Sequence, residues 1–214
     1  MTQVKFTSRA DAVFDQLEND ILTGVYKKGD IITETEISSA LNVSRTPVRE
    51  AIRRLEQEDL LKEIPKGHVV VGISPEDILD IYDIRIKIEG EATLRCAQNV
   101  TEEELNKMRE AVELQEFYTL KNYADKLKGT DSVFHDLIYK NSGSDIYQSI
   151  LSTLHRKVQL CRKTSFSGND RAKEAVVEHR EILTAIEKGD GELAKQLMIK
   201  HITNAKKNIE RLGK

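Results

Sequence analysis

Four side chains that commonly bind metal ions fall on the apolar faces of three expected helices. Asp131 and His135 lie one helical turn apart among core-type residues, and His179 and His201 each interrupt the apolar stripe of a later helix. Burying these four groups without partners would cost several kcal/mol of free energy. A divalent ion bound by all four would remove that cost. One carboxylate and three imidazoles suit a first-row metal such as Zn, Ni, Mn or Fe, and the donor set does not choose among them.

Three other interpretations of this polar stripe stay open. In the first interpretation, the stripe is a polar core held by hydrogen bonds, because a single buried histidine is more often satisfied by protein groups than by a metal. In the second, a bound metal activates water and the protein is an enzyme. Only His155 is placed where a general base could stand, so the sequence favours a non-catalytic site. In the third, a metal only stabilises the fold.

A second chemical pattern lies nearer the N-terminus, where arginines recur on one face of an expected helix. Arg45, Arg49 and Arg53 are spaced four residues apart and project from one side. The face expected to be buried carries Val48, Ile52 and Leu55. Arginines near a helix N-terminus suit the major groove of DNA, since guanidinium groups bond to guanine N7 and O6. The alternative is a solvated face on which Arg49, Arg53 and Arg54 pair with Glu50, Glu56 and Glu58.

The elements around this arginine face predict a winged helix-turn-helix over residues 1–73. Capping patterns at Ser8 and Thr33 begin the first two helices, and Ser44 or Thr46 is expected to cap the third. A β-hairpin follows, so the order is three helices and then a hairpin. The second and third helices are expected to cover about 33–41 and 45–59, and the hairpin about 60–73.

From residue 74 to residue 214 the sequence predicts helices alone. Six helical patterns are separated by short polar breaks, which is typical of an antiparallel bundle. Gly129 lies inside the third pattern and permits a break there. The predicted fold class is therefore mostly α, a winged helix-turn-helix followed by an antiparallel bundle of about six helices. These helices are expected near residues 75–98, 101–120, 122–141, 144–165, 171–188 and 190–211.

Composition and charge exclude several classes of protein. The 214 residues include 32% charged residues, three prolines and two cysteines, which favours a helical protein without a disulfide framework. No apolar run approaches the roughly 18 residues of a membrane helix, and no signal peptide is apparent. We therefore expect a cytoplasmic protein with no membrane contact. The formal net charge is −3, so any DNA binding must depend on local placement of cations.

The segment from Glu36 to Leu55, with its SRTPVREAIRRL run, resembles the winged-helix signature of GntR-family bacterial transcription regulators. The resemblance implies binding to double-stranded operator DNA. It assigns contacts with bases and phosphates to four residues of the recognition helix and its cap, and a minor-groove role to the tip of the wing. Relatives often have an arginine where this chain has Thr35, which alters one expected contact. The residues with these implied roles are Ser44, Arg45, Thr46 and Arg49, and in the wing Lys66, Gly67 and His68.

The bundle resembles the C-terminal effector domain of the FadR-type branch of the same family. In metal-binding members of that branch, an Asp-x-x-x-His pair and one histidine on each of the last two helices hold the ion. Asp131, His135, His179 and His201 match those positions. In the family, an arginine of the first bundle helix often contacts the effector, which implies this role for Arg85. The alternative for Arg85 is an ion pair with Glu89.

A polar flank on the fourth bundle helix adds to this expected pocket. His155 and Arg162 lie seven residues apart on that flank, where they line the effector cavity or face solvent. A cationic pocket beside a metal with open coordination positions favours a small carboxylate effector. Because one recognition helix reads only a few base pairs, a homodimer on paired half-sites is expected. The sequence thus predicts a ligand-responsive DNA-binding regulator, and a repressor in particular, with a metal sensor as the alternative.

Overall fold

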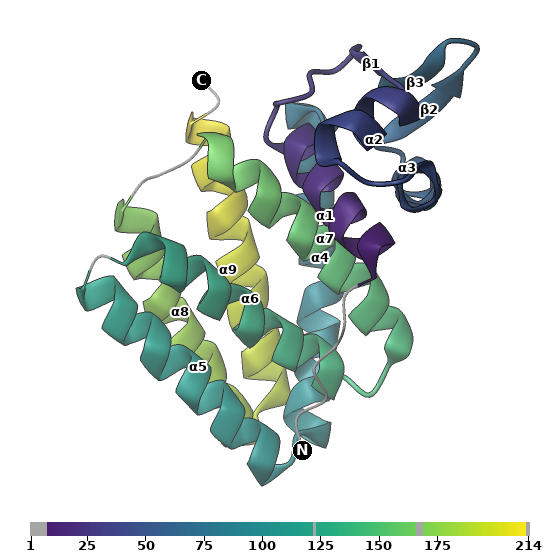
Figure 1. Cartoon of the computed structure of the whole chain (residues 1–214). Coiled ribbons are helices and arrows are strands. Elements are labelled where there is room, and N and C mark those ends of the chain that lie inside the picture. Colours follow the sequence, from purple (N-terminus) through teal and green to yellow (C-terminus); the bar gives the residue numbers. More distant parts are fainter. Residues whose placement is uncertain (1–7, 122, 166–168, 213–214) are drawn as a thin grey trace. The chain divides into compact units, whose positions relative to one another are not determined.

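The computed structural model describes residues 8–121, 123–165 and 169–212, and the chain divides into two compact units (Figure 1). The first unit ends at Ser74 and the second begins at Pro75. Within the described residues, the first unit contains three helices and a small antiparallel sheet. Its elements are α1 (Arg9–Leu22), β1 (Ile31–Ile32), α2 (Glu34–Leu41), α3 (Arg45–Gln57), β2 (Leu61–Ile64) and β3 (Gly67–Val70).

Capping residues fix where the first two helices begin. Ser8 and Asp11 form a capping box at α1, and Thr33 and Glu36 form one at α2. In each box the hydroxyl oxygen accepts a bond from a first-turn N–H, and the carboxylate accepts one from the N-cap N–H. Ser44 occupies the N-cap position of α3, but its side chain makes no capping hydrogen bond. The expected hydroxyl cap at α3 is therefore absent, and the Ser44 side chain stays exposed.

The apolar face of α3 and the wing complete the first unit. Val48, Ile52 and Leu55 are at most 1% exposed, and α3 packs against α1 and α2. The sheet has the order β1-β3-β2, with both pairings antiparallel. At the start of β3, Gly67 has φ +136°, and a Cβ atom there would lie 2.6 Å from the carbonyl oxygen of Ile32. This position requires glycine because any side chain would clash with the backbone of β1.

The second unit is a helical bundle, as the sequence predicts. α6 runs without interruption through Gly129, so the suggested break there is wrong. α4 contacts α6, α7, α8 and α9, and it is therefore the central helix of the bundle. In the described part of the chain, no helix is long and apolar enough to span a bilayer. The helices are α4 (Pro75–Asn99), α5 (Glu102–Leu120), α6 (Ala124–Asn141), α7 (Asp145–Ser165), α8 (Asn169–Glu187) and α9 (Gly191–Leu212).

Candidate metal centre and DNA-binding face

The four expected metal ligands converge inside the bundle. Asp131 and His135 come from α6, His179 from α8 and His201 from α9. One nitrogen from each of the three imidazoles lies within 4.8 Å of the others. The Nε2 atoms of His179 and His201 are 3.3 Å apart, and Oδ1 of Asp131 is 3.9 Å from His179 Nε2. The three imidazoles are buried, while Asp131 is half-buried at the edge of the group.

Each of these three imidazoles is held at its Nδ1 atom by an oxygen of another helix. A carboxylate or amide oxygen only accepts hydrogen bonds, so Nδ1 carries the proton and the Nε2 lone pair is left for another partner. Oxygen partners of this kind orient histidine ligands in metal sites. The three Nδ1–oxygen distances are all 2.7 Å, in the pairs His135–Glu89, His179–Gln115 and His201–Glu178.

The contact between His179 and His201 is the feature that most needs a cation. With both protons on Nδ1, two Nε2 lone pairs face each other across 3.3 Å, and such a contact is repulsive unless an electrophile lies between them. Protonation is disfavoured because burial lowers the pKa of His179 to about 3. Burial and then the neighbouring His179 also lower the pKa of His201 well below its usual range. The donor set therefore suits a divalent metal better than a proton.

Arg85 lies next to this cluster, but its guanidinium already has partners. Its Nε and Nη2 atoms donate to the carboxylate of Glu89 at 2.8 and 3.2 Å, and Nη2 lies 3.2 Å from Nδ1 of His155. Burial disfavours the Glu89 anion, yet Arg85 and then His135 hold the pKa of Glu89 well below its usual range. The ion pair that the sequence left as an alternative is thus present. A carboxylate ligand of Arg85 would have to compete with Glu89.

His155 is buried with 3% of its surface exposed, so the solvent-facing alternative is wrong. Both of its ring nitrogens face N–H donors, since Nδ1 is 3.2 Å from Nη2 of Arg85 and Nε2 is 3.3 Å from Nε2 of Gln159. The Nε2 atom of His155 is 3.6 Å from Oδ2 of Asp131. With Asp131 and His135, His155 forms a second group of side chains, each with one possible ligand atom within 4.8 Å of the others. The side chain of Arg162, expected beside it, lies outside the described residues.

The arginine face of α3 is exposed together with its cap. Ser44, Arg45, Thr46 and Arg49 are all solvent-exposed. Arg49 donates to Glu34 of α2 through Nε and Nη2, at 3.0 and 3.1 Å. This pair fixes the direction of Arg49 across the surface of the helix-turn-helix.

The ion pairs suggested for α3 from the sequence differ from those present. Arg54 donates to Asp11 of α1 at 2.7 Å and stacks on the Phe14 ring, with Cζ 3.9 Å from the ring centroid. Glu56 contacts His68 of the wing. The suggested pairing of Arg49 and Arg54 with glutamates of α3 itself is therefore wrong, because α1, α2 and the sheet supply nearer carboxylates and a nearer imidazole.

The remaining predicted DNA contacts lie at α2 and the wing. Thr35 is exposed in the first turn of α2, and Lys66 is exposed in the turn between β2 and β3. Gly67 follows it at the start of β3. His68 differs from these, since its ring is 14% exposed and its Nδ1 lies 2.9 Å from Oε1 of Glu56. The wing tip therefore presents Lys66, while His68 contacts α3.

Sequence reasoning missed the oxygens that hold the imidazoles. Gln115 had a detectable signal, because it is a polar residue on the buried stripe of α5. Glu89 was noted only as a partner for Arg85. Glu178 gave no signal, since it lies on the flank of α8 beside an exposed position. Gln159 donates to Oδ2 of Asp131 from the next helix, and only the packing of α6 on α7 reveals that contact.

Comparison with known proteins agrees with both units of the chain. Residues 9–71 match the family described as "Bacterial regulatory proteins, gntR family", and residues 80–204 match the "FCD domain". The chain belongs to the GntR family of bacterial transcription regulators. Its helical bundle is an FCD domain, and its fold class is the one that the sequence predicts.

Relatives of this GntR regulator match nearly its whole length. The HTH-type transcriptional regulator YdhC of Bacillus subtilis is 30% identical over 193 residues, covering 89% of this chain and 86% of YdhC. The HTH-type transcriptional repressor RspR of Escherichia coli K12 is 25% identical over 201 residues, covering 94% and 88%. The structure of E. coli McbR/YncC shares the fold, with a TM-score of 0.79 at 20% identity over 97% and 99% of the two chains. The two curated relatives are named as transcription regulators and not as enzymes.

Proposed function

We propose that this GntR regulator binds operator DNA as a homodimer and that a divalent metal in its bundle forms part of the effector site. The effector proposed is a small carboxylate, and the direction of control is repression, as in the relative named a repressor. The metal would be held by Asp131, His135, His179 and His201. A Zn, Ni, Mn or Fe ion fits these donors equally well.

The metal proposal rests on one observation. The Nε2 atoms of His179 and His201, which carry no proton in the tautomers assigned above, are 3.3 Å apart. Oxygens on the Nδ1 side of both rings prevent the tautomer change that would turn this contact into a hydrogen bond. A metal ion accepts both lone pairs at once, and it would supply Lewis-acid positions at which a carboxylate could bind. His155 is proposed to contact the effector or Asp131, and Arg162 is assigned to the effector from the sequence alone.

The DNA-binding proposal rests on the exposed N-terminal turn of α3. Arg45, Thr46 and Ser44 are exposed at the end of the helix whose N–H groups favour phosphate. Arg49 and Lys66 extend this surface along α3 and onto the wing. Arg85 would respond to effector by exchanging Glu89 for the effector carboxylate, which would couple ligand binding to the core of the bundle.

The first experiment measures the metal content of untagged protein purified without chelator, by elemental mass spectrometry. About one divalent ion per chain is expected, with loss in His179→Ala. His68→Ala, which removes a histidine of the wing, is the matched control and should keep the metal. A wild-type protein that is empty and takes up no added Zn, Ni or Mn would refute the metal site and leave a hydrogen-bonded polar core.

A metal sensor is the second candidate function. The ion pair between Arg85 and Glu89 favours it, because the guanidinium of Arg85 is already neutralised and is not free to bind an effector carboxylate. Operator affinity distinguishes the two functions. If chelation alone releases DNA and small carboxylates at saturation do not change the affinity, the ion is the signal. If carboxylates change the affinity of the metal-loaded protein, the effector proposal stands.

A further inference from the structure

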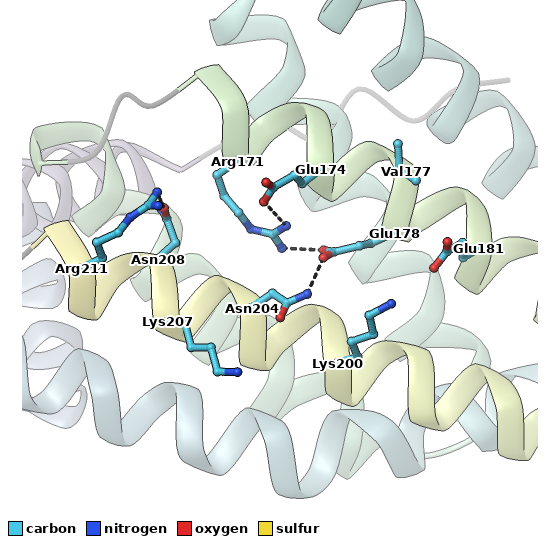
Figure 2. Close-up of a pocket in the computed structure, with 10 residues that line it drawn as sticks. All are labelled: Arg171, Glu174, Val177, Glu178, Glu181, Lys200, Asn204, Lys207, Asn208 and Arg211. Carbon is cyan, nitrogen blue, oxygen red and sulfur yellow. Dashed lines mark hydrogen bonds and ion pairs between the residues drawn. The ribbon is translucent and has the colours of Figure 1, made fainter.

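A groove between α8 and α9 carries cations that neither the metal site nor the DNA-binding face uses. Its volume is about 760 Å³, within the range of small-molecule sites. Figure 2 shows residues of both helices facing this groove, with charged groups along its length. The residues that matter here are Arg171 and Glu178 of α8, and Asn204, Lys207 and Arg211 of α9.

Arg171 is a buried cation with unused hydrogen-bond donors. Only 8% of its surface is exposed, and its Nη2 atom donates to Glu178 at 2.6 Å. Its Nε and Nη1 atoms have no hydrogen-bond partner in the described structure, and the carboxylate of Glu174 is 3.6 Å from Nη1. A buried donor without an acceptor costs free energy. An oxyanion in the groove would remove this cost by accepting hydrogen bonds from Nε and Nη1 of Arg171.

One end of the groove adds two exposed cations to this arginine. Lys207 and Arg211 lie one turn apart on α9, and within the described residues neither forms an ion pair with a carboxylate. Arg211 donates only to the amide oxygen of Asn208, at 3.0 Å. Glu181 lies at the opposite end of the groove, as Figure 2 shows. The end near Arg171 therefore carries three cations, Arg171, Lys207 and Arg211, against the two carboxylates of Glu174 and Glu178.

We propose that this end of the groove binds a small dianionic oxyanion, such as the phosphate group of a metabolite. Arg171, Lys207 and Arg211 would supply the donors, and the buried guanidinium would supply the selectivity for planar, bidentate contact with oxygen. This anion site lies beside the metal cluster, with Nη2 of Arg171 3.4 Å from Nδ1 of His201, but its existence does not depend on a bound metal.

The groove is nevertheless linked to the metal cluster through Glu178. The Oε2 atom of Glu178 accepts from Arg171 at 2.6 Å and lies 2.7 Å from Nδ1 of His201, while Oε1 accepts from Asn204 at 2.7 Å. An anion bound at Nε and Nη1 shares the charge of the guanidinium and weakens its Nη2 bond to Glu178, so Glu178 bonds more strongly to His201, and a more basic imidazole binds metal more tightly. We expect the anion to raise metal affinity. This part of the inference rests on the proposed metal site.

The anion site is tested by calorimetric titration of metal-free, full-length protein with inorganic sulfate at constant ionic strength, which holds screening fixed. Saturable binding is expected in the wild type, weakened about tenfold or more in Lys207→Gln/Arg211→Gln. The double variant Lys87→Gln/Lys188→Gln removes the same charge from exposed bundle positions outside the groove and should bind like the wild type. Absence of saturation in the wild type, or equal weakening in both variants, would overturn the assignment.

The coupling is tested by nickel competition with a chromophoric chelator, in sulfate and in chloride at equal ionic strength. Nickel affinity should rise about threefold or more in sulfate for the wild type and stay constant for Lys207→Gln/Arg211→Gln. Sulfate binding without a change in nickel affinity would show that the coupling is wrong and the groove assignment is right. Absence of nickel binding altogether would refute the metal site, and the calorimetry would then decide the groove by itself.

Discussion

The buried ion pair of Arg85 and Glu89 predicts a large loss of stability in a Glu89→Gln variant. Their side chains are 3% and 0% exposed, so glutamine would leave the guanidinium without an anion in the core. Removing one partner of a buried pair costs about 3–5 kcal/mol. In a chain of this size each kcal/mol lowers Tm by about 2–4 °C, so a decrease of about 6–20 °C is expected.

Urea unfolding of the metal-free protein, followed by far-UV circular dichroism, measures this loss on the helices of the bundle. Glu91→Gln is the matched control. Glu91 is on the same helix, but its ion pair with Lys195 is nearer the surface than that of Glu89, with the Glu91 side chain 42% exposed and the Lys195 side chain 27% exposed. The control should lose at most about 1 kcal/mol. Equal losses in the two variants would refute the reasoning. The double variant Arg85→Met/Glu89→Leu should recover only part of the stability, since no unpaired charge remains buried but His135 and Tyr139 lose their acceptor.

Three further predictions concern pH, the metal and DNA. Because burial lowers the pKa of His179 to about 3, the unfolded chain binds a proton below about pH 6.5 that the folded chain does not. The unfolding free energy of chelator-treated protein should therefore fall by about 1.4 kcal/mol per pH unit for this group as the pH drops from 6.5 toward 3. Unfolding monitored by circular dichroism measures it, and a free energy of unfolding that is constant across this pH range would contradict the prediction. Gln115→Met removes the oxygen that holds His179 and should weaken metal binding about 10–100-fold in a chelator competition, whereas exposed Gln148→Met should not change it. Arg45→Gln should weaken operator binding and reduce its dependence on salt by about one counterion, and an unchanged salt slope in fluorescence anisotropy would exclude a phosphate contact.

Local sequence patterns determined the helices, the wing and the identity of the four converging polar side chains. Capping boxes at Ser8 and Thr33 set two helix starts, because their bonds form between residues three apart. Apolar periodicity set the buried face of α3 and the inward stripes of α6, α8 and α9, and a polar residue on such a stripe, such as His135 or His179, stood out at once. Such features are local or periodic, so they can be found without knowing which helices are neighbours.

Only the tertiary structure decided which atoms of these residues are available. Glu89, Gln115 and Glu178 approach the imidazoles from three other places in the bundle and fix the proton of each ring on Nδ1. Arg85 and Gln159 bring N–H donors to the two ring nitrogens of His155. The same packing joins Glu178 to the groove of Arg171. Hydrogen-bond partners distant in sequence depend on how helices pack, and no periodicity along a single helix records that packing.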